Sequence, residues 1–134
     1  MNRSWIGLVL LAVSAAAILS TFSCGRSQQL VSISLQPSGG FVFEGYNAQG
    51  QFTAFGTYIH PPETKDITDK VTWTLDIANF GTVTPGGLVT YTRTDGCGSG
   101  LVTATYYSDP SNPESGSALI GTAPVSGANN SNCQ

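Results

Sequence analysis

Apolar and polar residues alternate with a period of two along most of the chain. Such alternation, in segments rich in Val, Thr, Phe and Tyr, is typical of half-buried β-strands. Five segments show it: VSISL (31–35), QFTAFGTY (51–58), VTWTL (71–75), LVTYT (88–92) and LVTATYY (101–107). Beyond an apolar run at the N-terminus, no stretch of about ten residues has the period of an amphipathic helix. The pattern therefore predicts an all-β protein.

Clusters of Gly, Pro, Asp, Asn and Ser separate these segments, as turns do. The clusters are PSGG (37–40), HPP (60–62), PGG (85–87), DGCGSG (95–100) and DPSNPESG (109–116). A further strand is expected at about 117–125. About seven short strands at this spacing predict one two-sheet β-sandwich over residues 30–127.

The alternation also predicts which side chains fill the space between the sheets. Trp73 lies in the middle of its segment, and Val71 and Leu75 share its face. A buried Trp is the packing centre of many sandwiches. The alternative is an exposed Trp that stacks on a sugar ring. The full predicted core is Phe52, Tyr58, Val71, Trp73, Leu75, Val102 and Ala104.

The N-terminus has a different character from the rest of the chain. Arg3 precedes an uncharged apolar run of 15 residues, 5–19. A membrane span needs about 20 apolar residues, so the run is short for one. A basic start, a short apolar run and small residues after it describe a secretory signal peptide, expected at 1–23. An uncleaved anchor helix is the alternative.

Cys24 follows the end of this region, and Ser23 before it is small. The position resembles the lipobox of bacterial lipoproteins, whose modified Cys becomes the first residue of the mature chain. The resemblance implies that Cys24 is the lipid attachment site and that residues 24–29 form a short tether. Ordinary signal cleavage after Gly25 is the alternative, and it would leave a freely secreted or periplasmic protein.

Composition narrows the class of partner. The chain has 134 residues, enough for one domain. Without Arg3, four Lys and Arg residues stand against eight acidic residues, which gives a net charge of −4. Nucleic acid and anionic lipid both attract basic faces, so the acidic balance argues against nucleic acid and against electrostatic lipid binding.

Three cysteines, an odd number, need an explanation in an exported protein. In the expected sandwich, the segment before about 101 and the segment after about 125 reach the same pole. Cys97 and Cys133 then converge, and an oxidising compartment allows a disulfide between them. The bond would hold the tail, residues 128–134, and contribute up to about 4 kcal/mol. A free Cys133 in a loose tail is the alternative.

Two candidate sites lie in the middle of the chain. His60 is the only histidine, and one His without spaced thiols does not make a zinc site. Asp66 and Asp69 could form a carboxylate pair for acid–base chemistry. Their spacing fits better a turn before the Trp73 strand, where Asp and Thr side chains cap backbone groups.

Two more candidates lie nearer the C-terminus. Asp109, Asn112 and Glu114 offer oxygen ligands for calcium, but they lack the ordered spacing of a calcium loop. The glycine-rich stretch 96–100 lacks the Lys and the helix of a phosphate loop, and Ser99 has no helix after it. We therefore expect no enzyme activity, no metal and no cofactor.

Several stretches together resemble the bacterial immunoglobulin-like domain of group 2, found in invasin- and intimin-like surface proteins. They are VSISLQPS (31–38), GQFTAFGTY (50–58), KDITDKVTWTL (65–75), FGTVTPGGLVT (80–90) and GLVTATY (100–106). The resemblance implies an immunoglobulin-like two-sheet β-sandwich after the signal peptide. It also implies a surface or spacer module, here in one copy, with a longer IHPPET turn (59–64) than the family has.

The expected function is that of an envelope-anchored lipoprotein, on the outer membrane if the cell is Gram-negative. It would display one domain as a structural or adhesive module with an unknown protein or polysaccharide ligand. Its contact surface is expected on loops at the pole away from the membrane, 59–64 or 108–117. One alternative is a carbohydrate-binding module that uses exposed aromatic rings: Phe41, Phe43, Tyr46, Tyr58, Tyr91, Tyr106 and Tyr107. Another is a small envelope assembly or inhibitor protein that pairs through an edge strand.

Overall fold

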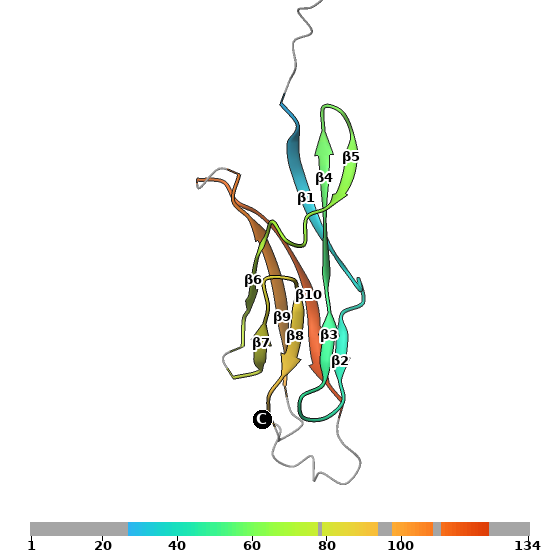
Figure 1. Cartoon of the computed structure of the whole chain (residues 1–134), viewed down its shortest axis with the longest axis vertical. Coiled ribbons are helices and arrows are strands. Elements are labelled where there is room, and N and C mark those ends of the chain that lie inside the picture. The colour runs from blue at the N-terminus through green and yellow to red at the C-terminus, as the bar shows by residue number, and fades with distance from the viewer. Residues whose placement is uncertain (1–26, 78, 94–97, 109–110, 124–134) are drawn as a thin grey trace, which may run out of the picture.

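A computed structural model of the chain describes residues 27–77, 79–93, 98–108 and 111–123. Within these ranges the protein is all-β, with ten strands and no helix (Figure 1). The strands are β1 (Gln29–Gln36), β2 (Phe41–Phe43), β3 (Gln49–Gln51), β4 (Thr53–Ile59), β5 (Glu63–Asp66), β6 (Thr72–Leu75), β7 (Gly81–Val83), β8 (Leu88–Tyr91), β9 (Ser99–Tyr106) and β10 (Glu114–Thr122). The described residues hold no helix long and apolar enough to cross a membrane.

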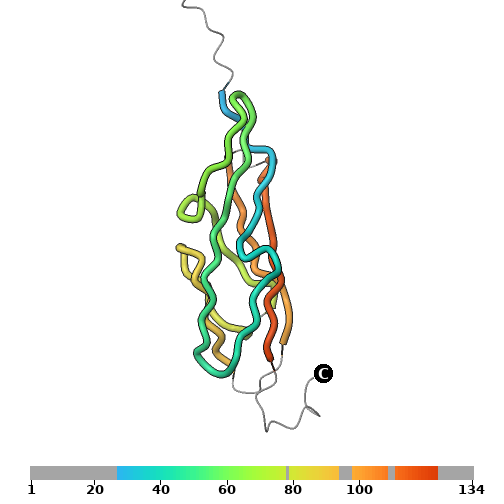
Figure 2. Tube along the Cα trace, turned by 90° about the vertical axis from the view of Figure 1, so that its right-hand side faces the viewer, coloured from blue at the N-terminus to red at the C-terminus, as the bar shows by residue number. Residues whose placement is uncertain are grey.

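The ten strands form three hydrogen-bonded sheets, ordered β1-β4-β5, β3-β8-β7 and β2-β10-β9-β6. Only Phe52 separates β3 from β4, so the first two sheets share one run of chain and make one layer. The run is continuous along the length of the molecule in Figure 2. The third sheet makes the other layer. The β-sandwich prediction is therefore confirmed, although about seven strands was too low a number.

The inward and outward positions of β1 differ in one detail from the predicted alternation. A β-bulge between Leu30 and Ser32 shifts the register with β4. A bulge adds one residue and turns the side chains before it to the other face. Leu30 is therefore buried beside Ile33, whereas Val31, expected on the same face as Ile33, is exposed.

The chain changes layers after β1. β1 pairs with β4 in one layer, ends at Gln36 before Pro37, and is followed by β2 in the other layer. β2 runs parallel to β10, whereas all other paired strands among the described residues are antiparallel. As a result β2 becomes the edge of the sheet that contains β9 and β10.

The core lies between the layers and is apolar throughout. Its buried members are Leu30, Ile33, Leu35, Phe43, Phe52, Ala54, Ile67, Val71, Trp73, Phe80, Val89, Tyr91, Val102, Ala104, Ala118 and Ile120. Of the seven predicted core residues, five are in this set. The other two, Tyr58 and Leu75, are partly buried and pack against it.

The sandwich is elongated and has two distinct ends (Figure 1). At the end that we call the N-terminal pole, β1 begins, and Gln29 pairs with Ile59 just before the β4–β5 turn. At the other end, the distal pole, β9 begins and β10 ends, with Ser99 paired to Gly121. Residues 1–26 and 124–134, which include the expected signal peptide and tail, lie outside the described residues.

Candidate binding surfaces

Trp73 is a core residue in this structure. Its side chain is 8% exposed, and its Nε1 donates a hydrogen bond of 3.0 Å to the backbone oxygen of Thr68. Gly87, at a φ of 79°, covers the ring so closely that a Cβ there would lie 2.9 Å from it. Since a side chain at Gly87 would meet both this ring and a strained backbone, the position favours glycine. Trp73 is therefore unavailable for stacking on a sugar.

The Asp66–Asp69 segment builds the turn that supports Trp73. Asp66 Oδ1 accepts bonds from the Thr68 amide at 2.9 Å and the Thr68 hydroxyl at 2.6 Å. The same hydroxyl accepts the amide of Ala54 at 3.0 Å, so a polar chain links the turn to β4. These bonds favour the charged carboxylate and lower the pKa of Asp66. Asp66 caps backbone groups here, as the turn interpretation predicted.

The other candidate catalytic and metal-ligating residues lie in different parts of the fold. His60 lies exposed in the β4–β5 turn with a φ of 62°. Ser99 opens β9, and Glu114 opens β10 at the opposite end of that strand pair. Asp109 lies outside the described residues. Within the described ranges, no three His, Cys, Asp or Glu residues gather where they could hold a metal ion.

A hollow of about 230 Å³ opens at the N-terminal pole. Residues from both layers line it: Ser27, Gln28, Gln29, Leu30, Tyr58, Tyr106 and Ser108. Burial is the main cause that raises the pKa of the Tyr58 phenol, with the Tyr106 phenol adding to it. The lining mixes hydroxyl and amide groups with aromatic rings, so it suits a small polar group better than a large apolar one.

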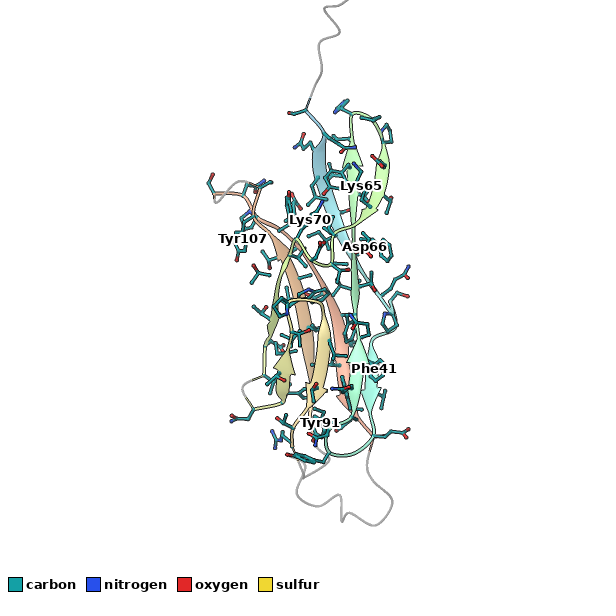
Figure 3. All side chains as sticks on the ribbon, in the orientation of Figure 1. Phe41, Lys65, Asp66, Lys70, Tyr91 and Tyr107 are labelled. Atoms are coloured by element: carbon teal, nitrogen blue, oxygen red, sulfur yellow. The ribbon has the colours of Figure 1, made fainter. Side chains whose placement is uncertain are left out.

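Three polar side chains contact one another at this pole, where Figure 3 shows Lys65. Lys65 Nζ lies 2.9 Å from Glu63 Oε2, and Gln28 bonds to both partners at 2.9 Å. The Lys65 ammonium also lies 5.5 Å from the centre of the Tyr58 ring. The hydrogen bond from Lys65 is the main cause that lowers the pKa of Glu63. Gln28, expected in the tether, is thus fixed to the domain, and Gln29 already belongs to β1.

The expected position of the two contact loops was wrong. The 59–64 turn and the 108–117 region were expected at the pole away from the N-terminus. Both reach the N-terminal pole instead, because β4 and β9 run toward the end where β1 begins (Figure 1). This polarity could not be read from alternation, which is the same in both directions.

The aromatic residues do not form a common exposed face. Phe43 and Tyr91 are buried, and Phe41, Tyr58 and Tyr106 are partly buried against the core. Only Tyr46 and Tyr107 are largely exposed. Tyr46 follows β2 near the distal pole, whereas Tyr107 follows β9 toward the N-terminal pole. A flat stacking face of three or more rings, which a sugar platform needs, is not present among the described residues.

A different surface went unrecognised in the sequence. The outward residues of the β2-β10-β9-β6 sheet, here called the outer face, carry hydroxyl or aliphatic groups and no charge. They are Val42, Thr72, Thr74, Ser99, Leu101, Thr103, Thr105, Ser115, Ser117, Leu119 and Gly121. A signal for it exists: Leu101 and Leu119 occupy outward positions where the alternation predicts polar residues.

The edge strands differ in how well they are protected from pairing. β1 is an eight-residue edge strand without charge, QLVSISLQ, although it packs beside β10. β5 carries Glu63, Lys65 and Asp66, and charged side chains discourage pairing with another chain. β1 therefore has the character that the edge-strand alternative requires.

Cys24, Cys97 and Cys133 all lie outside the described residues, so lipid attachment and disulfide pairing stay predictions. The neighbourhood of the proposed disulfide is described. The amide and the hydroxyl of Thr122 donate to the Gly98 oxygen at 3.1 and 3.3 Å. The residue after Cys97 and the end of β10 are therefore neighbours.

Comparison with models of known protein families gives no match, and comparison with curated proteins gives none. The resemblance to the group 2 bacterial immunoglobulin-like domain and the lipoprotein signal therefore stay predictions.

Proposed function

We propose that this chain is an envelope lipoprotein that displays one immunoglobulin-like domain as a structural or adhesive module. The observation that carries the proposal is the position of Cys24, which follows the short apolar run of residues 5–19 and lies five residues before β1 begins. A lipid there would attach the sandwich by one pole.

The mechanism is presentation. More than one acyl chain gives stable anchoring, and bacterial lipoproteins carry more than one. Gln28 is already bonded to Glu63 and Lys65, so only a few residues separate the anchor from the folded domain. The distal pole would then point away from the membrane, together with the distal part of the outer face.

Two other functions remain as alternatives. A carbohydrate-binding module is less well supported, because Trp73 is buried and the exposed rings of Tyr46 and Tyr107 lie far apart in the fold. An assembly or inhibitor protein acting through an edge is supported by the uncharged β1. We propose no catalysis, no cofactor and no nucleic-acid partner.

The test is the fate of the N-terminus in a bacterial host. The wild-type chain should fractionate with membranes, and its N-terminal peptide should begin at an acylated Cys24. Cys24→Ser should accumulate as an unprocessed, unlipidated precursor. Cys133→Ser, the matched control, removes a different cysteine and should remain lipidated. A mature N-terminus beyond Cys24, or an unmodified Cys24 thiol, would overturn the proposal.

A further inference from the structure

The distal part of the outer face has a regular pattern of large and small residues in two neighbouring rows. Pairing between β9 and β10 puts Leu101 beside Leu119 in one row and Ser99 beside Gly121 in the next. β2 adds Val42 beside Gly121. Gly40, just before β2, has a φ of 80° and its side-chain direction points at the backbone of Leu119, so it takes no outward position in these rows.

The large members of this pattern protrude. Leu119 is 64% exposed, Val42 is 60% exposed and Leu101 is 37% exposed. The small members leave space: a Cβ built on Gly121 would meet no atom within 4 Å. On β9 and on β10, one large aliphatic residue therefore has a small residue two positions away on the same face.

This arrangement is complementary to itself. A two-fold axis that runs across the strands, between the two rows, exchanges one row for the other. In a second copy placed by that axis, Leu119 faces Gly121 and Leu101 faces Ser99. In both columns a protruding side chain meets a small residue, and Val42 lies beside them at the edge. Sheets pack face to face with strands aligned within about 30°, which such an arrangement allows.

We propose that the distal outer face binds a second copy of this chain in an antiparallel, two-fold symmetric dimer. Two-fold interfaces use the same patch on both subunits, so a patch that complements itself fits another copy better than an unrelated partner.

The distribution of charge leaves this face open to a second copy. The chain has a net charge of −3, so two copies repel each other over most of their surfaces. The outward positions of its strands carry no charged residue; Glu114, the charged residue on these strands, opens β10 at the end opposite to the two rows. Among the described carboxylates, Glu44 follows the end of β2 and Asp76 the end of β6, where Asp76 Oδ1 accepts the Leu101 amide at 2.7 Å. A second copy can therefore approach this face without placing like charges opposite each other.

The antiparallel orientation has a consequence that rests on the proposed function. The two rows lie toward the distal pole, and β1 begins at the opposite pole (Figure 1). The dimer therefore directs its two N-terminal poles away from each other. With a lipid at each N-terminus, the paired chains would join two opposing membranes rather than two neighbours on one membrane.

The contact is small, so we expect weak association in solution, with a Kd on the order of 0.1 mM. Many copies on one membrane would strengthen the junction through multivalency. The affinity measured in solution is therefore a lower bound for the strength of adhesion between vesicles.

The first test uses the fragment 27–134, which contains all ten described strands, with thermal melting to check each variant's fold. Sedimentation equilibrium should show a reversible dimer. Leu119→Glu should weaken it at least about tenfold. Val31→Glu, the matched control, adds the same charge at an exposed aliphatic position on β1 and should leave the dimer intact.

A swap tests the proposed geometry. Leu119→Gly removes the protrusion and Gly121→Leu fills the space, so each change alone should weaken the dimer. The double variant exchanges the two rows at β10, and the same symmetry should restore association. Small-angle scattering should show a dimer longer than the monomer; a dimer of monomer length would overturn the antiparallel arrangement.

The second test uses the full lipidated chain in lipid vesicles. Light scattering should show that vesicles cluster, and Leu119→Glu should abolish the clustering.

A monomer at millimolar concentration would overturn the inference, as would a dimer that is lost with Val31→Glu instead of Leu119→Glu. If a dimer forms only after residues 124–134 are removed, those residues and not a second copy cover the face. If the chain forms the dimer but carries no lipid, the proposed function is wrong and the dimer inference still holds.

Discussion

The two ends of this sandwich are held together in different ways. Near the distal pole, aromatic rings fill the space between the layers. Phe43 lies 4.9 Å from Phe41, 5.6 Å from Phe80 and 6.2 Å from Tyr91, measured between ring centres. At the N-terminal pole, a hollow of about 230 Å³ and a polar trio of Gln28, Glu63 and Lys65 take the place of such packing.

This difference in packing between the two poles indicates which pole can present a rigid binding surface. Buried aromatic rings contribute large areas and specific geometry, so they hold the distal strands in register. Exposed polar contacts contribute little to stability and are screened by salt. We therefore expect the distal half, which carries the outer-face pattern, to be rigid, and the N-terminal pole to tolerate changes of sequence.

The largest expected effect is at the distal cluster. Phe43→Ala removes a fully buried ring and leaves a cavity among Phe41, Phe80 and Tyr91. The free energy of unfolding should fall by about 3–5 kcal/mol, as in other large-to-small core changes. Trp73→Ala should fall in the same range. Chemical denaturation followed by fluorescence or circular dichroism measures both.

A matched control lies three residues away. Tyr46→Ala removes an aromatic ring that is 60% exposed, and should change stability by about 0.5 kcal/mol or less. Equal losses for Phe43→Ala and Tyr46→Ala would contradict the division between a packed distal core and its surface.

Sequence reasoning found part of the core but missed the distal aromatic cluster, because Phe43 and Tyr91 were candidates for exposed rings and Phe80 was not predicted to be buried. Alternation places Phe52, Trp73, Val102 and Ala104 inward, and all are buried. The short strands β2 and β5 were missed because three or four residues carry no readable period, and β5 is polar.

What sequence reasoning could not supply is long-range. The bulge at Leu30 that exposes Val31 depends on pairing with β4, and the polarity of the 59–64 turn depends on which pole β4 reaches. Local alternation places Leu119 and Gly121 on one face of β10, but the rest of the outer-face pattern needs strand register. Pairing with β9 puts Leu101 beside Leu119, and pairing with β2 puts Val42 beside Gly121.

An intermediate effect is expected at the turn between the two ends. Asp66 has a pKa lowered below its ordinary value of 3.8 by the two bonds from Thr68. Its stabilising contribution is present above pH 4 and is lost as the pH falls through the lowered pKa. Asp66→Asn should lower the melting temperature at pH 7, and the variant should lose less stability than wild type between pH 7 and pH 2.

Asp69→Asn is the control for this titration. It removes a carboxylate from the same turn but leaves the bonds of Asp66 to Thr68 in place. It should keep the acid sensitivity of the wild type. If Asp66→Asn also keeps that sensitivity in full, the Asp66–Thr68 bonds do not link the fold to pH.

The smallest effect is expected at the N-terminal pole. Lys65→Met keeps the length of the side chain but removes its bonds to Glu63 and Gln28 and its contact with the Tyr58 ring. Because these groups are largely exposed, the melting temperature should change little, and less at high salt. The pKa of Glu63, lowered mainly by the Lys65 bond, should rise toward its ordinary value, which NMR titration of the Glu63 carboxyl measures. A loss of stability as large as that of Phe43→Ala would mean that the polar trio, and not the aromatic cluster, holds the sandwich together.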